Sequence, residues 1–501
     1  MLKKKSRIIV WSIVGGLLLT LTIVVLRADR IAENMASQRL TQLAAEQNID
    51  LRWHDIDIYL LQGKVQIDSL SVGLSVADSV KADTTFIHIS LPRLSVGSVH
   101  WLALLRERRA QIDAVRVTNG HVALSKSADS TMLTLDSICV AVHDLCYNLT
   151  DSLLTYNDSV YSLQTGGLHF RSADGLFAAA VGSIRTADAG MIILTNISGG
   201  NTDKPEEHGR LMGKQEVTWS RFRLPSVHTS PVNIIRMAKA NEVRIDSVLV
   251  VGQSADVYYD SKYPPKQPYP MPQQALLELK TPLHIRRMIA TLDTTRLYVT
   301  SDGKNVGKLD LLQTKARIIN LGNIPDRTMM TGLHSHFAGG GEMRVKTDMQ
   351  LNKRGTFTYN ADITELKGSS LKSLTKPMLG VELNCNIHNM SVQCAGNNTK
   401  MNGTFCMQYD SLSVHVDDHS PMEVMARLSW LVNAFAPVVL INQNPRNPNE
   451  EPISYEVSAT RDPMKPFPAY FLTVMADGML QTVLPFGLGK RALEKKKKVK
   501  K

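Results

Sequence analysis

The feature that most constrains the fold is a period-two alternation of apolar and polar residues that recurs between residues 50 and 420. Alternating side chains point to opposite faces of a strand, so such a segment buries one face of a sheet. Turn-forming residues interrupt the pattern every eight to twelve positions, and long helical patterns are nearly absent. The sequence therefore predicts a mainly β chain built on a large antiparallel sheet. The clearest segments are 65–67, 86–89, 115–117, 297–299 and 411–416.

Four segments of the chain resemble one another and suggest a weak internal repeat. They begin at Ile67, Ile112, Ile245 and Ile289, and each is interpreted as a strand, a turn and a second strand. A unit of this kind cannot bury its apolar face alone, so neighbouring units should stack into one sheet. The irregular spacing argues against a propeller or a β-helix.

A 19-residue segment without a charged residue, 8–26, predicts a membrane anchor. As a helix it would be about 28 Å long, close to the roughly 30 Å hydrocarbon core of a bilayer. Four basic residues precede it, which places the N-terminus in the cytoplasm and the rest of the chain across the membrane. A cleaved signal peptide is the alternative, but the apolar run is long for one and no A-x-A site follows. The anchor positions singled out are Ile8, Trp11, Leu17 and Leu26.

The net charge of +11 resides entirely in the two tails. Residues 1–7 carry four positive charges and residues 490–501 a net of seven, so the body is neutral. Nucleic-acid binders spread basic residues over a folded face, and no such partner is expected. Basic tails on a neutral body are typical of contacts with a membrane surface.

Helices are predicted at 28–47, 422–441 and 467–484. In the last of these, polar residues follow one narrow stripe and apolar residues cover the remaining surface. Three interpretations stay open: a helix lying in a membrane interface, a helix docked on the sheet, and a second spanning helix. The membrane-surface candidates are Phe471, Met475, Met479, Lys495 and Lys497.

The five cysteines form no C-x-x-C pair, so neither a redox nor a zinc signature is present. Cys394 and Cys406 flank a predicted hairpin with a turn near Lys400, which would place them opposite one another. A disulfide between them and free buried thiols are both compatible with the sequence.

Catalytic signatures are absent from the sequence, including G-x-S-x-G, Walker, G-x-G-x-x-G and H-E-x-x-H motifs. His334 and His336 would share a strand face, but no carboxylate–histidine set surrounds them in the sequence. We therefore expect exposed histidines there. The sequence predicts no catalytic residue, no metal site and no cofactor, and the chain is not expected to be an enzyme.

Aspartate followed by serine recurs along the chain, as in Asp68-Ser69, Asp136-Ser137 and Asp410-Ser411. The pattern resembles the acceptor motif of the O-glycosylation system of Bacteroidetes envelopes. The alternative is that these pairs lie at turns and strand starts, where their side chains bond to local backbone.

Three regions together resemble the AsmA-like proteins of Gram-negative envelopes, in their Bacteroidetes form. They are the anchor with 51–72, the segment 91–125, and the segment 376–416, in which Gly380 precedes the first strand of a hairpin. The last segment carries the most specific pattern, formed by Gly403, Met407, Tyr409, Asp410 and Leu412.

The resemblance implies a long, curved, twisted antiparallel sheet that forms an apolar groove, with a few short helices, behind an N-terminal transmembrane helix. The groove would shield lipid acyl chains between two membranes. Period-two alternation places four residues on a face that is either a core or a groove wall. These lipid-groove candidates are Val115, Val117, Val122 and Leu124.

The expected organisation is a basic tail and anchor (1–27), an N-terminal helix and β-groove region (28–262), a proline-rich loop (263–273), a C-terminal β region (274–420), a helical segment (421–489) and a lysine-rich tail (490–501). The expected function is lipid binding or transfer from the inner membrane, facing the periplasm, in support of the outer membrane. The expected partners are phospholipid or another envelope lipid, the inner membrane, and the outer membrane or one of its assembly proteins. The alternative is a non-enzymatic envelope scaffold or outer-membrane protein assembly factor of the same fold.

Overall fold

The computed structural model describes residues 29–46, 49–59, 62–77, 84–100, 109–126, 131–148, 153–155, 161–187, 190–211, 218–263, 265, 267–300, 304–416, 440–447 and 449–483. The chain divides into two compact units. Unit 1 comprises residues up to 202 together with 228–233, and unit 2 comprises 203–227 and the residues from 234 onward. The main division therefore falls at residue 202, and a short segment, 228–233, returns to unit 1.

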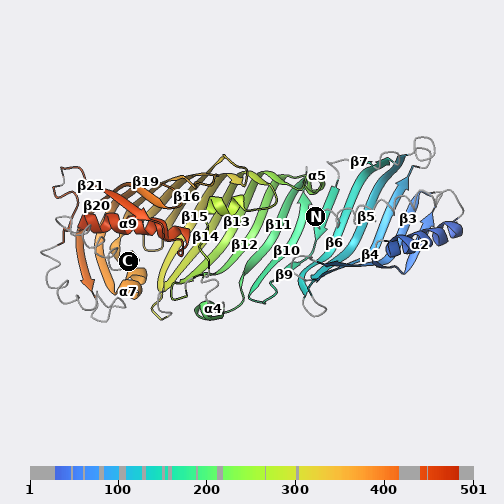
Figure 1. Ribbon diagram of the computed structural model, residues 1–501, viewed down its shortest axis with the longest axis horizontal. Coiled ribbons are helices and arrows are strands. Elements are labelled where there is room, and N and C mark those ends of the chain that lie inside the picture. The colour runs from blue at the N-terminus through green and yellow to red at the C-terminus, as the bar shows by residue number, and fades with distance from the viewer. Residues whose placement is uncertain are drawn as a thin grey trace. The chain divides into compact units, whose positions relative to one another are not determined.

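Unit 1 is an antiparallel sheet with one described helix, α2 (Asp29–Glu46), at its β1–β2 end (Figure 1). Most strands pair with their neighbours in sequence, while β8 and β9 both lie between β6 and β10. The strands are β1 (Asp50–Arg52), β2 (Asp55–Tyr59), β3 (Lys64–Ala77), β4 (Thr84–Val99), β5 (Arg109–Ser125), β6 (Thr131–Asn148), β7 (Leu153–Thr155), β8 (Tyr161–Thr165), β9 (Leu168–Arg171), β10 (Phe177–Ala187) and β11 (Met191–Asn201).

Unit 2 is also mainly β, with a few short helices. Its strands from β14 to β21 pair antiparallel in chain order, whereas β13 and β14 pair in parallel. The elements are α4 (Pro205–Leu211), β12 (Thr218–Pro231, whose last residues belong to unit 1), α5 (Ile234–Ala240), β13 (Val243–Asp260), α6 (Pro272–Leu277), β14 (Leu283–Thr300), β15 (Gly307–Gly322), β16 (Thr328–Phe337), β17 (Glu342–Gln350), β18 (Phe357–Lys367), η3 (Gly368–Leu371), α7 (Lys372–Leu379), β19 (Val381–Gly396), β20 (Lys400–Val416), β21 (Ser454–Thr460) and α9 (Phe467–Val483).

The predicted mainly β fold with a large antiparallel sheet and few short helices is thus confirmed. The helices predicted at 28–47 and 467–484 are α2 and α9, while 422–441 lies outside the described residues. No described helix is long and apolar enough to cross a membrane. The anchor positions Ile8, Trp11, Leu17 and Leu26 fall outside the described part of the chain.

The four repeat segments are single long strands, so the strand–turn–strand interpretation is wrong. In β3 and β5, Ser69 and Asn119 have φ of 54° and 55° and lie inside continuous strands. A residue in the left-handed region within a strand is typical of a β-bulge, which bends the strand without ending it. Ser137 and Ser411, the serines of two other Asp-Ser pairs, adopt the same conformation, with φ of 51° and 56°.

The proline-rich loop packs within unit 2 and is not a free linker. The Tyr269 amide donates to the Pro463 carbonyl at 2.8 Å, and the Arg461 guanidinium donates to the Tyr269 carbonyl. Met271, which follows directly, is fully buried in the core of unit 2. The loop and α6 therefore cover part of the sheet.

All five cysteines are free, and the predicted hairpin register is shifted. Cys394 lies opposite Gly403, and Cys406 lies opposite Ser391. The turn is centred between residues 398 and 399, which separates the two thiols along the hairpin. Cys394 is buried, and its burial raises the pKa of the thiol to about 11.

Candidate apolar binding face

Unit 1 carries four rows of apolar side chains that run across its strands. The rows are defined by directly paired residues, and cross-strand pairs lie on the same face of a sheet. The first row is Val72, Ile89, Val122, Leu135, Leu168, Val181 and Ile197. The second is Leu74, Ile87, Leu124, Leu133, Phe170 and Ala179. The third is Ile67, Leu94, Val117, Val140 and Leu163, and the fourth is Val65, Val96, Val115 and Val142.

The bulges keep all four rows on one face. In β3 the apolar positions are odd-numbered before Ser69 and even-numbered after it, and in β5 the same change occurs around Asn119. Without the extra residue of a bulge, a change of parity would turn half of each strand's apolar side chains to the opposite face. The four predicted groove positions, Val115, Val117, Val122 and Leu124, therefore lie one in each row.

Burial falls along the rows away from α2. In β3, Ile67 is 2% exposed and Val72 7%, because both pack in one cluster with Ala36 and Leu40 of α2. From β5 to β10 the described residues of the first two rows are only partly buried. The apolar face is thus covered at the α2 end and accessible beyond it. We call its part from β5 to β10 the open face.

Two hollows lie along the second row. One of about 560 Å³ is bounded by the end of α2 and by Leu74 and Ile87. The other, of about 450 Å³, lies over β6, β9 and β10 and is lined by Leu133, Phe170 and Ala179. Polar residues also line both hollows, among them His88 in the first and Arg171 in the second, and volumes of this size lie in the range of sites that bind small molecules.

In unit 2 the corresponding space is filled by the protein itself. α9 crosses β20 and β21 (Figure 1). Its Phe471 ring stacks on Tyr359 with ring centroids 3.9 Å apart. Phe357 makes edge contacts with both Phe467 and Phe471. α9 approaches closely at Gly478, where a Cβ would lie 2.1 Å from the Phe405 ring.

This packing corrects the assignment of the membrane-surface candidates. Phe471, Met475 and Met479 pack against the core cluster of unit 2, so the docked helix is the alternative that the structure adopts. Their apolar side chains are held by the sheet because α9 presents its apolar side to it. Lys495 and Lys497 lie outside the described residues.

Most of the residues of the C-terminal pattern build the core of unit 2. Met407 and Tyr409 are 4% and 2% exposed, and Leu412 is partly buried against the same core cluster. The Tyr409 hydroxyl donates to the Ile441 carbonyl at 2.6 Å. At Gly403 a Cβ would meet the Gln393 carbonyl oxygen at 2.0 Å, so only glycine fits.

The remaining pattern residues order the hairpin and its approach. Asp410 accepts hydrogen bonds from Ser411 and Asn386 and pairs with His388 at 2.6 Å, which lowers the pKa of its carboxyl to about 2. Gly380 ends α7 with φ of 66°, a conformation that favours glycine, directly before β19. These roles are structural.

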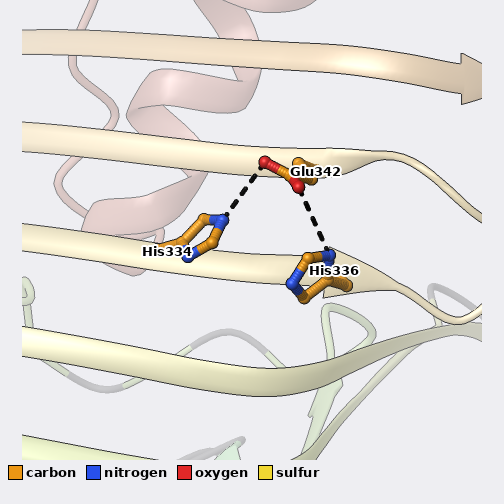
Figure 2. A group of neighbouring side chains, drawn as sticks. All are labelled: His334, His336 and Glu342. Atoms are coloured by element: carbon orange, nitrogen blue, oxygen red, sulfur yellow. Dashed lines mark hydrogen bonds and ion pairs between the residues drawn. The ribbon is translucent and has the colours of Figure 1, made fainter.

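Two histidine groups stand apart from the apolar face. On the hairpin β16–β17, His334 and His336 lie beside Glu342, a carboxylate that the sequence analysis did not place there (Figure 2). The signal was present: 339–341 are three glycines, and a turn at that point pairs His336 with Glu342. The expectation that no carboxylate accompanies the two histidines is therefore wrong.

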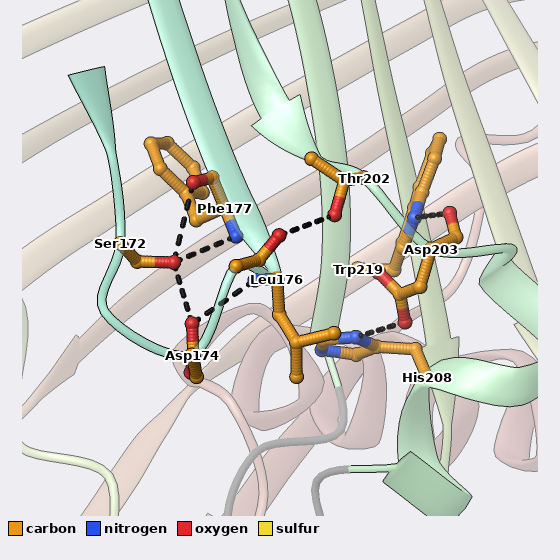
Figure 3. Close-up of polar contacts among 9 residues, drawn as sticks. Ser172, Asp174, Leu176, Phe177, Thr202, Asp203, His208 and Trp219 are labelled. Atoms are coloured by element: carbon orange, nitrogen blue, oxygen red, sulfur yellow. Dashed lines mark hydrogen bonds and ion pairs between the residues drawn. The ribbon is translucent and has the colours of Figure 1, made fainter. Parts of the chain in front are cut away.

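The second group is buried in unit 2. His208 Nδ1 lies 2.8 Å from Asp203 Oδ2, and the two side chains are 1% and 6% exposed (Figure 3). The Trp219 indole donates to the Asp203 carbonyl at 3.1 Å. In unit 1, Ser172 and Asp174 close the turn before β10 by a separate set of hydrogen bonds (Figure 3). Both sets fix local backbone.

No protein-family model, curated protein or solved structure matches the chain. The feature of unit 1 that could bind a ligand is its accessible apolar surface, the open face.

Proposed function

We propose that the chain is an inner-membrane-anchored, periplasm-facing protein that binds or transfers lipid and so supports the outer membrane. The observation that carries the proposal is the open face of unit 1, where four apolar rows remain accessible. An extended apolar surface lowers the cost of exposing acyl chains to water, at about 25 cal/mol for each Å² that becomes buried. Such a role requires no catalytic residue.

The dimensions of the face suit an acyl chain. The first row crosses seven strands, from β3 to β11. Six steps at about 4.8 Å give a row of about 29 Å, whereas one leaflet of a bilayer has a hydrocarbon depth of about 15 Å. A row can therefore lie along a complete acyl chain. The location and the lipid partner follow from the predicted anchor and from the resemblance to AsmA-like proteins.

The filled core of unit 2 supports a second function, that of an envelope scaffold or outer-membrane protein assembly factor. A face occupied by its own helix has no space for an acyl chain. If unit 1 were covered in the same way, the chain would be a structural element only.

The test is mass spectrometry of lipids retained by the full chain after purification in mild detergent and washing. We expect stoichiometric phospholipid or lipid A in the wild type and its loss in Val117→Asp, because a carboxylate on the open face opposes acyl-chain burial. Thr118→Asp is the matched control, since Thr118 is exposed at the adjacent position of β5. It should retain lipid.

Circular dichroism of both variants separates the two functions. A folded Val117→Asp protein without lipid supports the proposal. A wild type free of lipid, or a Val117→Asp chain that unfolds, would assign the face to a closed core and favour the scaffold.

A further inference from the structure

The hairpin β16–β17 of unit 2 presents two imidazoles and one carboxylate on the same face. His336 pairs with Glu342 across the hairpin, and His334 pairs with Arg344. Ser335 and Phe337, which alternate with the histidines, are buried. The three side chains therefore project from the face opposite the core, and each is 36–37% exposed.

Their ligand atoms are already close to the spacing that a metal ion requires. His334 Nε2 lies 3.3 Å from Glu342 Oε2, and His336 Nδ1 lies 4.0 Å from Glu342 Oε1 (Figure 2). One ligand atom from each residue falls within 4.8 Å of the others. Ligand atoms about 2.0–2.2 Å from a tetrahedral zinc ion are about 3.3–3.6 Å apart, so small side-chain rotations complete the set.

The carboxylate is held in place by its neighbours. His334 lies within hydrogen-bond distance of it, and Arg344 forms an ion pair with it. Arg344 donates to Oε2 at 3.1 Å, which leaves Oε1 facing His336. Outer contacts of this kind orient metal ligands in known sites.

We propose that His334, His336 and Glu342 bind a divalent late first-row transition-metal ion such as Zn²⁺ or Cu²⁺. Two imidazoles and a carboxylate suit these ions and disfavour Ca²⁺ and Mg²⁺, which take mostly oxygen ligands. Three protein ligands on an exposed hairpin leave the remaining coordination positions to water. The site is independent of the apolar face, so it goes beyond the lipid function.

The experiment titrates Zn²⁺ into the chelator-treated full chain in detergent, in competition with a chromogenic chelator. We expect one saturable site per chain that His334→Ala, His336→Ala and Glu342→Gln each weaken. Removal of a residue that only hydrogen-bonds to a metal ligand typically lowers metal affinity by about 10–100-fold. Loss of a direct ligand should therefore lower the Zn²⁺ affinity by about 100-fold or more. Affinity should also fall as the pH is lowered, because the imidazoles must be neutral to bind.

The matched control is His388→Ala, which removes a histidine–carboxylate pair that lacks a second histidine. It should leave Zn²⁺ affinity unchanged. In Cu²⁺-loaded protein, electron paramagnetic resonance should show coordination by two nitrogens that is lost in the His334 and His336 variants. Absence of a saturable site, or equal weakening by His388→Ala, would overturn the proposal.

Discussion

Units 1 and 2 are both built from long, bulged strands with alternating apolar residues. They differ in how much of the apolar face of the sheet is covered by other segments of the chain. In unit 1 the rows are buried only at the α2 end. In unit 2 a cluster that includes the fully buried Phe405 and Met401 is covered by α9 and by α6. The comparison shows that alternation of apolar and polar residues along the strands produces an apolar face. Whether that face becomes a buried core or stays accessible depends on the segments between and after the strands.

The largest expected difference between the units is the cost of removing one aromatic ring. Phe405→Ala empties a fully buried position, and we expect a loss of about 3–5 kcal/mol in the free energy of unfolding of unit 2. Phe170→Ala removes a partly buried ring of the open face, and we expect a loss of about 1 kcal/mol in unit 1. Hydrogen–deuterium exchange, measured by mass spectrometry on peptides from each unit, gives the two free energies of unfolding.

These two variants test the comparison from both sides. Each should affect exchange mainly in its own unit. Equal costs for Phe170→Ala and Phe405→Ala would mean that the face of unit 1 is as filled as that of unit 2.

Thiol labelling should distinguish the units next. Burial raises the pKa of Cys394 from 9.0 to about 11, which lowers its thiolate fraction at neutral pH by about 100-fold. Cys139 in unit 1 is partly exposed. We expect a maleimide to modify Cys139 in the native protein and Cys394 only after unfolding, as measured by mass spectrometry of peptides.

Denaturant provides the control for this measurement, since both thiols should then react at similar rates. Rapid native labelling of Cys394 would show that the core of unit 2 opens readily.

The smallest expected effect is a pH dependence confined to unit 2. Lys376 and Lys372 hold the pKa of Glu382 at about 2, below its ordinary 4.5. Because the folded-state pKa is lowered, the stabilisation is present above pH 4.5 and is lost as the pH falls toward 2. We expect the melting temperature of Glu382→Gln to lie slightly below that of the wild type at pH 7 and to converge with it as the pH approaches 2.

Salt is the control here, because the ion pair is partly exposed to solvent and screening should reduce the difference. A gap between the two proteins that stays constant from pH 7 to pH 3 would contradict the assignment.

Period-two alternation was enough to predict the sheet, and helical spacing of apolar and polar residues was enough to predict α2 and α9. The alternation could not predict that Ser69 and Asn119 continue their strands, because serine and asparagine in the left-handed region serve both turns and bulges.

The candidate sites show the same division between local and long-range information. The four lipid-groove candidates, Val117 among them, were predicted from alternation alone. This was possible because the face of a strand on which a side chain lies depends only on nearby residues. Covering by α9 depends on contacts such as Phe471 with Tyr359, which are more than a hundred positions apart. The carboxylate beside His334 required the exact hairpin register, which the three glycines at 339–341 specify only once they are recognised as a turn.

The parallel pairing of β13 with β14 has a consequence for the order in which unit 2 folds. The pairs from β14 to β17 are joined by short turns and can form as local hairpins, whereas β13 and β14 meet only across the connection 261–282. That connection carries Met271 and α6 onto the sheet, and α9 is synthesised after every strand that it covers. Closure of the unit 2 core is therefore a late event. Until it occurs, nascent unit 2 exposes an apolar sheet as bare as the open face of unit 1, and in that interval the chain is most exposed to aggregation.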